Sequence, residues 1–185
     1  MQNLNYYMND NVKDDYICIE VEGITFLSTG KYYDGINNII SHDLKHADKA
    51  AIQYAARKMA ALLPSDSIVV PIPNHHGTAK ETLFLAKAVA EYSHSSIANI
   101  LIGKPRESNY LMKKLGSPLA EEQMGFQQTK PLPDGITPII IDGVVDTGTS
   151  AKAAFHALGD GIVLSFAMSN TLLEQQEVQS VGFHR

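Results

Sequence analysis

The sequence contains a single cysteine, Cys18, which excludes a disulfide framework and any zinc or iron–sulfur site built from several cysteines. It also lacks a basic surplus: 15 Lys+Arg stand against 20 Asp+Glu, which argues against general nucleic-acid binding. No apolar run approaches the roughly 20 residues that span a bilayer, and residues 1–13 are too polar for a secretory signal. We therefore expect a soluble cytoplasmic protein with neither a nucleic-acid nor a membrane partner.

The rest of the composition is typical of a folded domain. The chain has 185 residues, of which 44% are hydrophobic and 19% charged, so it can bury a core. By the usual size of about 100–200 residues per domain, this is one main unit. We expect an N-terminal arm and hairpin over residues 1–43, an α/β core over 44–170 and a C-terminal tail over 171–185.

Strand-like and helix-like segments alternate along the core. The predicted strands are short apolar runs expected to be buried: residues 67–71, 96–101, 138–141 and 161–168. The predicted helices follow cap-like residues, namely Asp43 for a helix to about Leu63, a capping box of Thr78 and Glu81 for a helix to Tyr92, and a third helix ending before Gly159. This alternation predicts an α/β fold with a parallel sheet flanked by helices.

Residues 103–134 break this pattern. They show no sustained periodicity, and a long irregular stretch in a compact domain is usually functional or disordered. Five basic residues gather there: Lys104, Arg106, Lys113, Lys114 and Lys130. We interpret the stretch as a flexible lid that closes over an anion, with a plain solvated loop as the alternative.

The segment from Ile139 to Ser150 carries the most chemical information. A buried strand ends, Asp142 follows, and a Thr-Gly-Thr-Ser turn opens a helix. Ligands of α/β sheets bind outside the carboxyl ends of strands, and the first amides of a helix favour an anion. The hydroxyl groups of the turn add donors, and Gly148 lets the backbone approach closely. The turn therefore suits a phosphate, while Asp142 and Asp146 can hold sugar hydroxyls, a water on Mg²⁺ or a proton.

This segment resembles the phosphoribosyl-diphosphate (PRPP) signature of type I phosphoribosyltransferases, and its Asp-Thr-Gly is similar to that of purine-salvage members. Val70-Pro71-Ile72-Pro73 and the turn to Gly77 resemble the diphosphate loop of the competence-associated branch. Lys104-Pro105-Arg106 and Met124-Gly125-Phe126 look like parts of its lid. The resemblance implies that the N-terminal hairpin and the C-terminal tail build a small hood that receives the nucleophile.

The resemblance implies an enzyme that transfers the phosphoribosyl group of Mg-PRPP to a nitrogen heterocycle, most simply a nucleobase, with release of diphosphate. It assigns PRPP binding to Asp142, Gly143, Val144, Val145, Asp146, Thr147, Gly148, Thr149 and Ser150. Asp146 is the implied catalytic residue. The implied diphosphate loop contains Asn74, His75 and His76, and the implied lid residues are Lys104 and Arg106. Mg²⁺ is the implied cofactor, held mainly by substrate oxygens and water, and Asp142 is the one protein group that we consider as a direct ligand. We also consider that the protein forms a homodimer.

Two departures keep an alternative open. Gly143 stands where the family has a second acid that holds the ribose, and residues 168–170 lack the lysine with which some members read a purine carbonyl. The cysteine-rich zinc module of the competence-associated branch is also missing. The acceptor is therefore undefined, and the alternative function is a catalytically weak regulatory protein that senses PRPP or a nucleotide.

Simpler interpretations stand beside these roles. In the simpler interpretation of Asp146, this residue is the N-cap of the following helix and has no other role. The neighbouring His75 and His76 are expected to face opposite ways on extended chain, so they do not chelate one ion. Phe166 is predicted to belong to the core rather than to stack on a base.

Overall fold

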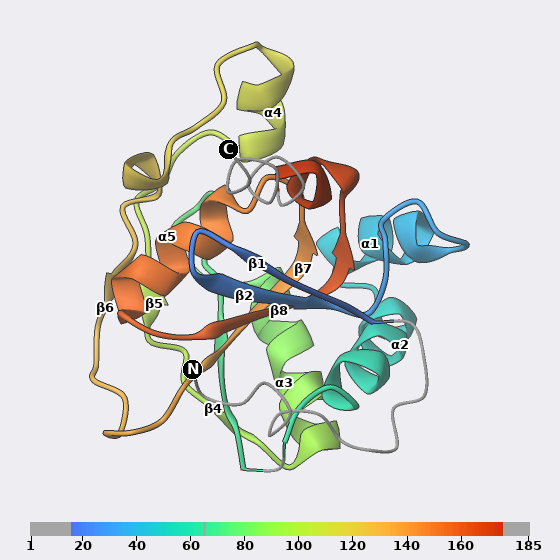
Figure 1. Ribbon diagram of the computed structural model, residues 1–185, viewed down its shortest axis with the longest axis vertical. Coiled ribbons are helices and arrows are strands. Elements are labelled where there is room, and N and C mark those ends of the chain that lie inside the picture. Colours follow the sequence, from blue (N-terminus) through green and yellow to red (C-terminus); the bar gives the residue numbers. More distant parts are fainter. Residues whose placement is uncertain (1–15, 65, 176–185) are drawn as a thin grey trace, which may run out of the picture.

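A computed structural model describes residues 16–64 and 66–175. These residues form a fold with one main sheet at its centre (Figure 1). The six strands have the order β1-β2-β8-β7-β3-β4. They are β1 (Ile17–Val21), β2 (Ile24–Ser28), β3 (Ile68–Pro71), β4 (Ser96–Ile97), β7 (Ile139–Val145) and β8 (Ile162–Met168). All neighbouring pairs are parallel except β1 and β2. The predicted α/β fold with a mostly parallel sheet is confirmed.

Helices cover both faces of the sheet because successive residues of a strand point to opposite sides. Ile139 and Ile141 of β7 join one core cluster, to which α1 (Asn37–Lys45), α2 (Lys49–Ala60) and α3 (Glu81–Ser93) contribute. Ile140 joins the second cluster, with α5 (Thr149–Leu158). Burying one such side chain stabilises the fold by about 1.5–3 kcal/mol, so these isoleucines fix β7 between two helical layers. Among the described residues, no helix is both long and apolar enough to cross a membrane.

The single helix predicted from Asp43 to Leu63 is wrong, because the structure contains two helices there. α1 begins at Asn37, six residues before the predicted start, and ends at Lys45. Ala47 then adopts a left-handed conformation with φ 54°, and Asp48 is extended. The Asp48 side chain accepts a hydrogen bond from the Ala51 amide at 2.9 Å and caps α2. A side-chain cap competes with helix continuation, and no proline or glycine marks the break in the sequence.

The strand predicted at residues 96–101 is also wrong. Only Ser96 and Ile97 pair with β3, and both are exposed. The chain then leaves the main sheet through a tight turn, in which the Ile100 amide bonds to the Ala98 carbonyl. Leu101–Ile102 form β5, which pairs with β6 (Gln127–Gln128) in a separate antiparallel sheet. The apolar sequence therefore conceals two short strands in different sheets.

The predicted lid contains regular structure. Between β5 and β6 lie α4 (Asn109–Lys114) and the 3₁₀ helix Glu121–Met124. Figure 1 shows α4 projecting from the body of the protein. Pairing of β5 with β6 brings the two ends of the segment together. The β5–β6 pair is thus the stem of the lid, and the residues between these two strands carry a short projecting helix.

The predicted N-terminal hairpin is confirmed, and it extends the main sheet. β1 pairs antiparallel with β2, and β2 pairs parallel with β8. The hood expected from this hairpin and the C-terminal tail stays a prediction. Residues 1–15 of the arm and 176–185 of the tail lie outside the described residues.

The two candidate caps of α2 can be tested against each other. Asp48→Ala removes the cap of α2 and is expected to lower the free energy of unfolding by about 1 kcal/mol. Asp43→Ala is the control: within residues 16–64 and 66–175 its carboxylate bonds only to the exposed His42 ring, and the expected change is under about 0.5 kcal/mol. Urea unfolding of both variants checks the difference. A larger effect at Asp43 would contradict the assignment of the cap.

Candidate functional site

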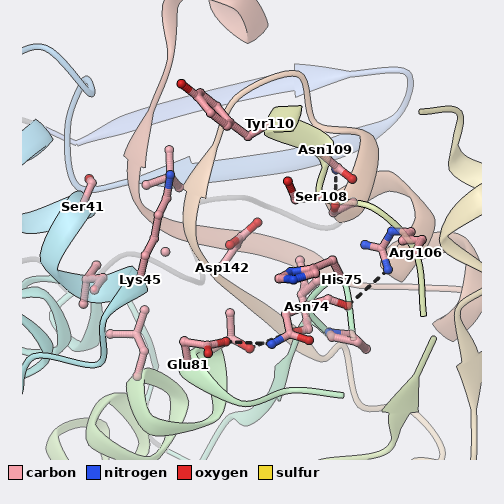
Figure 2. Close-up of a pocket in the computed structure, with 18 residues that line it drawn as sticks. Ser41, Lys45, Asn74, His75, Glu81, Arg106, Ser108, Asn109, Tyr110 and Asp142 are labelled. Atoms are coloured by element: carbon pink, nitrogen blue, oxygen red, sulfur yellow. Dashed lines mark hydrogen bonds between the residues drawn. The ribbon is translucent and has the colours of Figure 1, made fainter. Parts of the chain in front are cut away.

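Two adjoining cavities open at the carboxyl ends of β3 and β7, the edge of a parallel sheet where ligands bind. Their volumes are about 490 Å³ and about 200 Å³. Six residues line both: Lys45, Asn109, Tyr110, Asp142, Val144 and Ser150. Figure 2 shows the larger cavity, with Asp142 between Lys45 and His75. One ligand can therefore extend from one cavity into the other.

Asp142 lies within a strand, so the loop predicted to start at this residue begins later. β7 continues to Val145, paired with β8 through Asp142↔Ser165 and Val145↔Met168. On the other side, the pairing of β3 with β7 ends at Pro71↔Ile141. Because β3 stops there, the next residues of β7 have one neighbouring strand instead of two. Their side chains and backbone are left to border the cavities.

The turn after β7 presents the start of α5 to the smaller cavity. Gly148 precedes the helix with φ +82°, a left-handed conformation that favours glycine. No side chain caps α5, so the alternative that Asp146 is merely its N-cap is wrong. The hydroxyls of Thr147 and Thr149 lie 2.9 Å apart beside the first amides. The Thr149 amide also donates a long hydrogen bond, of 3.5 Å, to Thr147 Oγ1. The amides and hydroxyls at this helix N-terminus together form a suitable cradle for an anion.

All nine residues predicted to bind PRPP line these cavities. The larger cavity is bordered by Asp142, Gly143, Val144 and Ser150. The smaller is bordered by Asp142, by Ser150 and by every residue from Val144 to Thr149. A contiguous motif thus reaches both cavities, because strand, turn and helix follow one another at the sheet edge.

Asp142 is a carboxyl group poised to gain or lose a proton near neutral pH. It is half-buried where the two cavities meet. Burial raises its pKa to about 6, and the amides of Gly143 and Val144 and the charge of Lys45 oppose that rise. The carboxylate can therefore accept hydrogen bonds from a ligand that replaces the water it has lost.

Asp146 is in the opposite electrostatic state. Partial burial alone would raise its pKa, but hydrogen bonds from Lys113 and Ser169 outweigh it and hold the pKa below the usual range. Lys113 Nζ lies 2.6 Å from Asp146 Oδ2, and Ser169 Oγ donates to Oδ1 at 2.7 Å. Asp146 is consequently ionised at neutral pH, and a side chain of α4 occupies one of its oxygens.

The loop after β3 contributes two of its three predicted residues. Asn74 and His75 line the larger cavity, whereas His76 does not line it. The two imidazole rings were expected to face opposite ways, and this is wrong: their centroids lie 4.0 Å apart. Asn74 Oδ1 accepts a hydrogen bond from the His76 amide, and this turn brings the rings to the same side.

Glu81 has a different role from the predicted one. α3 begins at Glu81 without a side-chain cap, so the capping box with Thr78 is wrong. Instead Glu81 Oε2 accepts a hydrogen bond from Asn74 Nδ2 at 2.8 Å (Figure 2). Partial burial tends to raise the pKa of Glu81, but this hydrogen bond, the Glu81 backbone amide and the charges of Lys80 and His75 together keep the pKa below its usual range. Glu81 thus fixes the Asn74 side chain at the wall of the larger cavity.

Arg106 connects the lid stem to the loop that follows β3. The other predicted lid residue, Lys104, lines neither cavity. The backbone amide of Arg106 donates to the His75 carbonyl at 2.8 Å, and Nη1 of the Arg106 side chain donates to the Asn74 carbonyl at 3.2 Å. The guanidinium lies over the Phe126 ring, 5.4 Å from its centroid. The two predicted lid fragments therefore meet, and Arg106 positions the 74–77 loop.

Sequence reasoning missed several polar residues of the larger cavity. Within the described residues, three buried side-chain atoms have no hydrogen-bond partner: Ser41 Oγ, Arg106 Nε and Asn109 Oδ1. All three residues line the larger cavity. An unpaired buried polar atom costs about 1–3 kcal/mol, so a ligand that pairs with these atoms gains affinity. No motif marks Ser41 or Asn109, because they come from helices far apart in the sequence.

The site fits a magnesium ion carried on a substrate. Mg²⁺ retains several waters and is usually held by one or two carboxylates together with substrate phosphates. Asp142 presents one half-buried carboxylate at the junction of the cavities, close to the anion cradle of α5. Its oxygen donors are of the kind that Mg²⁺ prefers.

Comparison with known proteins adds no family. The chain matches no protein-family model, and no curated protein matches it. Its function is therefore inferred from the residues and the geometry of the two cavities.

The half-buried charge of Asp142 predicts a pH-dependent stability difference. Because its pKa is raised to about 6, the folded state disfavours the ionised form, and this cost is present above pH 6 and vanishes toward pH 3.8. Asp142→Asn should therefore stabilise the protein by about 1–2 kcal/mol at pH 8 and hardly at all at pH 4. Urea unfolding at both pH values measures this. The exposed Asp134→Asn is the control, and an Asp142→Asn effect independent of pH would contradict the assignment.

A glycine contact between the two loops gives a second prediction. A Cβ on Gly77, which has φ +85°, would lie 2.4 Å from the Gly103 carbonyl oxygen. Gly116 has φ +75° but open space around it, so Gly116→Ala reports the backbone strain alone. We expect Gly77→Ala to cost at least about 1 kcal/mol more than Gly116→Ala, with faster hydrogen exchange at the Gly103 amide. Equal thermal shifts in the two variants would show that the loops are not in close contact.

Proposed function

We propose that the protein transfers the phosphoribosyl group of Mg-PRPP to a ring nitrogen of a heterocycle, with release of diphosphate. One observation supports this function above others: the whole segment Asp142–Ser150 borders two adjoining cavities and includes an N-terminus of α5 that no side chain caps. A sugar phosphate needs a cradle for its phosphate beside acceptors for its hydroxyls. This segment supplies both within nine residues.

The smaller cavity holds the 5′-phosphate. The first amides of α5 point toward the ligand, and the hydroxyls of Thr147, Thr149 and Ser150 donate hydrogen bonds to the phosphate oxygens. Gly148 gives the turn its left-handed backbone conformation, and a Cβ there would face the buried Leu172 and Phe26 and not the cavity. The positive end of the α5 dipole adds an attraction of typically 0.3–1 kcal/mol.

Asp142 holds the ribose. Its carboxylate accepts a hydrogen bond from a sugar hydroxyl at the junction of the cavities. When bound with PRPP, Mg²⁺ neutralises charge on the diphosphate, and Asp142 is the residue of this chain that would hold it. In the larger cavity, Asn74 and His75 form the wall toward the diphosphate, while Arg106 keeps their loop in place.

Asp146 receives the proton of the acceptor. The bond between the anomeric carbon and the diphosphate oxygen breaks, and its electron pair leaves with the diphosphate. The carbon becomes oxocarbenium-like, as in other glycosyl transfers, and the ring nitrogen forms the new bond. The nitrogen gives up its proton to the ionised carboxylate of Asp146, which acts as general base.

The alternative function, a PRPP or nucleotide sensor, is supported by Gly143. The ribose clamp implied by the family uses two acids, and here only Asp142 is present. Packing does not require glycine at this position, since a Cβ would meet only Leu44 Cδ1, at 3.7 Å. Titration calorimetry of PRPP with and without Mg²⁺, followed by a diphosphate-release assay with a panel of heterocycles, separates the two functions. Binding without release on any heterocycle identifies the sensor.

Asp146→Asn tests the catalytic assignment. The amide cannot take the proton, so the variant is expected to lose about 10²–10⁴-fold in turnover while it still binds PRPP. Steady-state assays give the turnover, and calorimetry gives the affinity. Asp134→Asn, at an exposed position outside both cavities, should match the wild type. Unchanged turnover in Asp146→Asn would remove Asp146 from the mechanism.

A further inference from the structure

Helix α4 lies against the phosphate turn through two polar side chains on one of its faces. Asn109 Nδ2 donates to Ser150 Oγ at 2.9 Å, and Lys113 Nζ donates to Asp146 Oδ2 at 2.6 Å. Residues four apart lie on the same side of a helix. No residue of α4 is buried. The position of α4 over the turn therefore depends on polar contacts that can be exchanged, not on apolar packing.

Both contacted groups are ones that the proposed function gives to the ligand. Ser150 belongs to the phosphate cradle and Asp146 to the proton transfer. In this structure the side chains of α4 occupy them. Ser150 Oγ accepts from Asn109 and donates to Met124 Sδ at 3.8 Å, so it can turn its proton to a phosphate while the bond from Asn109 stays. A ligand that uses Asp146 Oδ2 must displace Lys113 or bind to Lys113 as well.

The Lys113–Asp146 pair is weak enough to be exchanged. Both side chains are about half exposed, at 49% and 46%. Exposed ion pairs of this kind contribute only about 0–1 kcal/mol. A phosphate monoester carries up to two negative charges and three acceptor oxygens, against one charge on Asp146, and it sits at a helix N-terminus. Lys113 should therefore leave Asp146 for a phosphate bound in the smaller cavity, which Lys113 itself lines.

Asn109 supplies a second, independent observation. Its Oδ1 is buried without a hydrogen-bond partner, although its Nδ2 is bonded to Ser150. The residue lines both cavities (Figure 2). A half-satisfied amide at this place is ready to accept a hydrogen bond from a ligand hydroxyl while its amino group stays near the phosphate.

We propose that Asn109 and Lys113 are ligand-binding residues that recognise the phosphate end of a sugar phosphate. Without ligand, Lys113 screens Asp146. When the phosphate binds, Lys113 moves from the carboxylate to the phosphate and leaves Asp146 free for the acceptor. This inference rests on the proposed function, and it adds a lid contact to the 5′-phosphate, whereas the sequence prediction for Lys104 and Arg106 concerned the diphosphate.

Ribose 5-phosphate is the probe for the test, because it carries the phosphate without the diphosphate. Calorimetric titration compares the wild type with Lys113→Met and with Lys114→Met. Lys114 has the same charge on the same exposed helix but lines neither cavity. We expect Lys113→Met to weaken binding by about 5- to 10-fold, the loss of one charge-assisted hydrogen bond, and Lys114→Met by less than about 2-fold.

Asp146→Asn provides the sharper comparison, because removing the competing carboxylate should release Lys113. The variant is expected to bind ribose 5-phosphate about 3-fold more tightly than the wild type, and this gain should disappear in Lys113→Met/Asp146→Asn. A gain of the same size without Lys113 would reflect only the lost negative charge and would overturn the exchange.

The outcomes separate this inference from the proposed function. If the wild type binds ribose 5-phosphate and the Lys113→Met and Lys114→Met variants behave alike, the role of α4 is wrong while the phosphate cradle stands. If the wild type binds neither ribose 5-phosphate nor PRPP, both the role of α4 and the proposed function are wrong.

Discussion

The unequal length of two neighbouring strands creates the site. β3 ends at Pro71, whereas β7 continues past its last pairing with β3 at Ile141 and remains bonded to β8 alone. A strand that loses one neighbour presents residues to space that a longer β3 would fill. Asp142 stands at the first position beyond the pairing, and the turn that starts α5 follows at once. The cavities, the anion cradle and the contact with α4 all depend on this step in the sheet.

The two carboxylates on either side of that step differ because their surroundings differ. Asp142 is shielded from water, which raises its pKa to about 6, whereas Asp146 bonds to Lys113 and Ser169, which keep it ionised. The proposed function gives these two acids, four residues apart, different tasks: Asp142 would pair with hydroxyls of a bound sugar, and Asp146 would accept a proton. The neighbouring α4 bonds to Asp146 and to Ser150, and the proposed exchange of Lys113 would couple these tasks.

Local features of the sequence were sufficient for the start of β7, the turn and α5, because Gly148 and the flanking apolar runs determine them within one short segment. They did not show that β7 continues through Asp142 to Val145, which depends on pairing with β8. Local features were insufficient where two similar cap residues compete, and where residues far apart in the sequence form the contact. The break between α1 and α2 depends on the cap formed by Asp48, which the sequence offers no more clearly than Asp43. Lys113 was recognised only as part of a basic lid, since its contact with Asp146 spans 33 positions and needs the closed β5–β6 stem.

A crystal structure of the protein soaked with Mg²⁺ and PRPP tests the central claim most directly. The account predicts the 5′-phosphate on the first amides of α5, within hydrogen-bond distance of the Thr149 and Ser150 hydroxyls, and the ribose beside Asp142. Density for PRPP at another place, or a turn whose amides remain covered by other side chains at saturating PRPP, would contradict it.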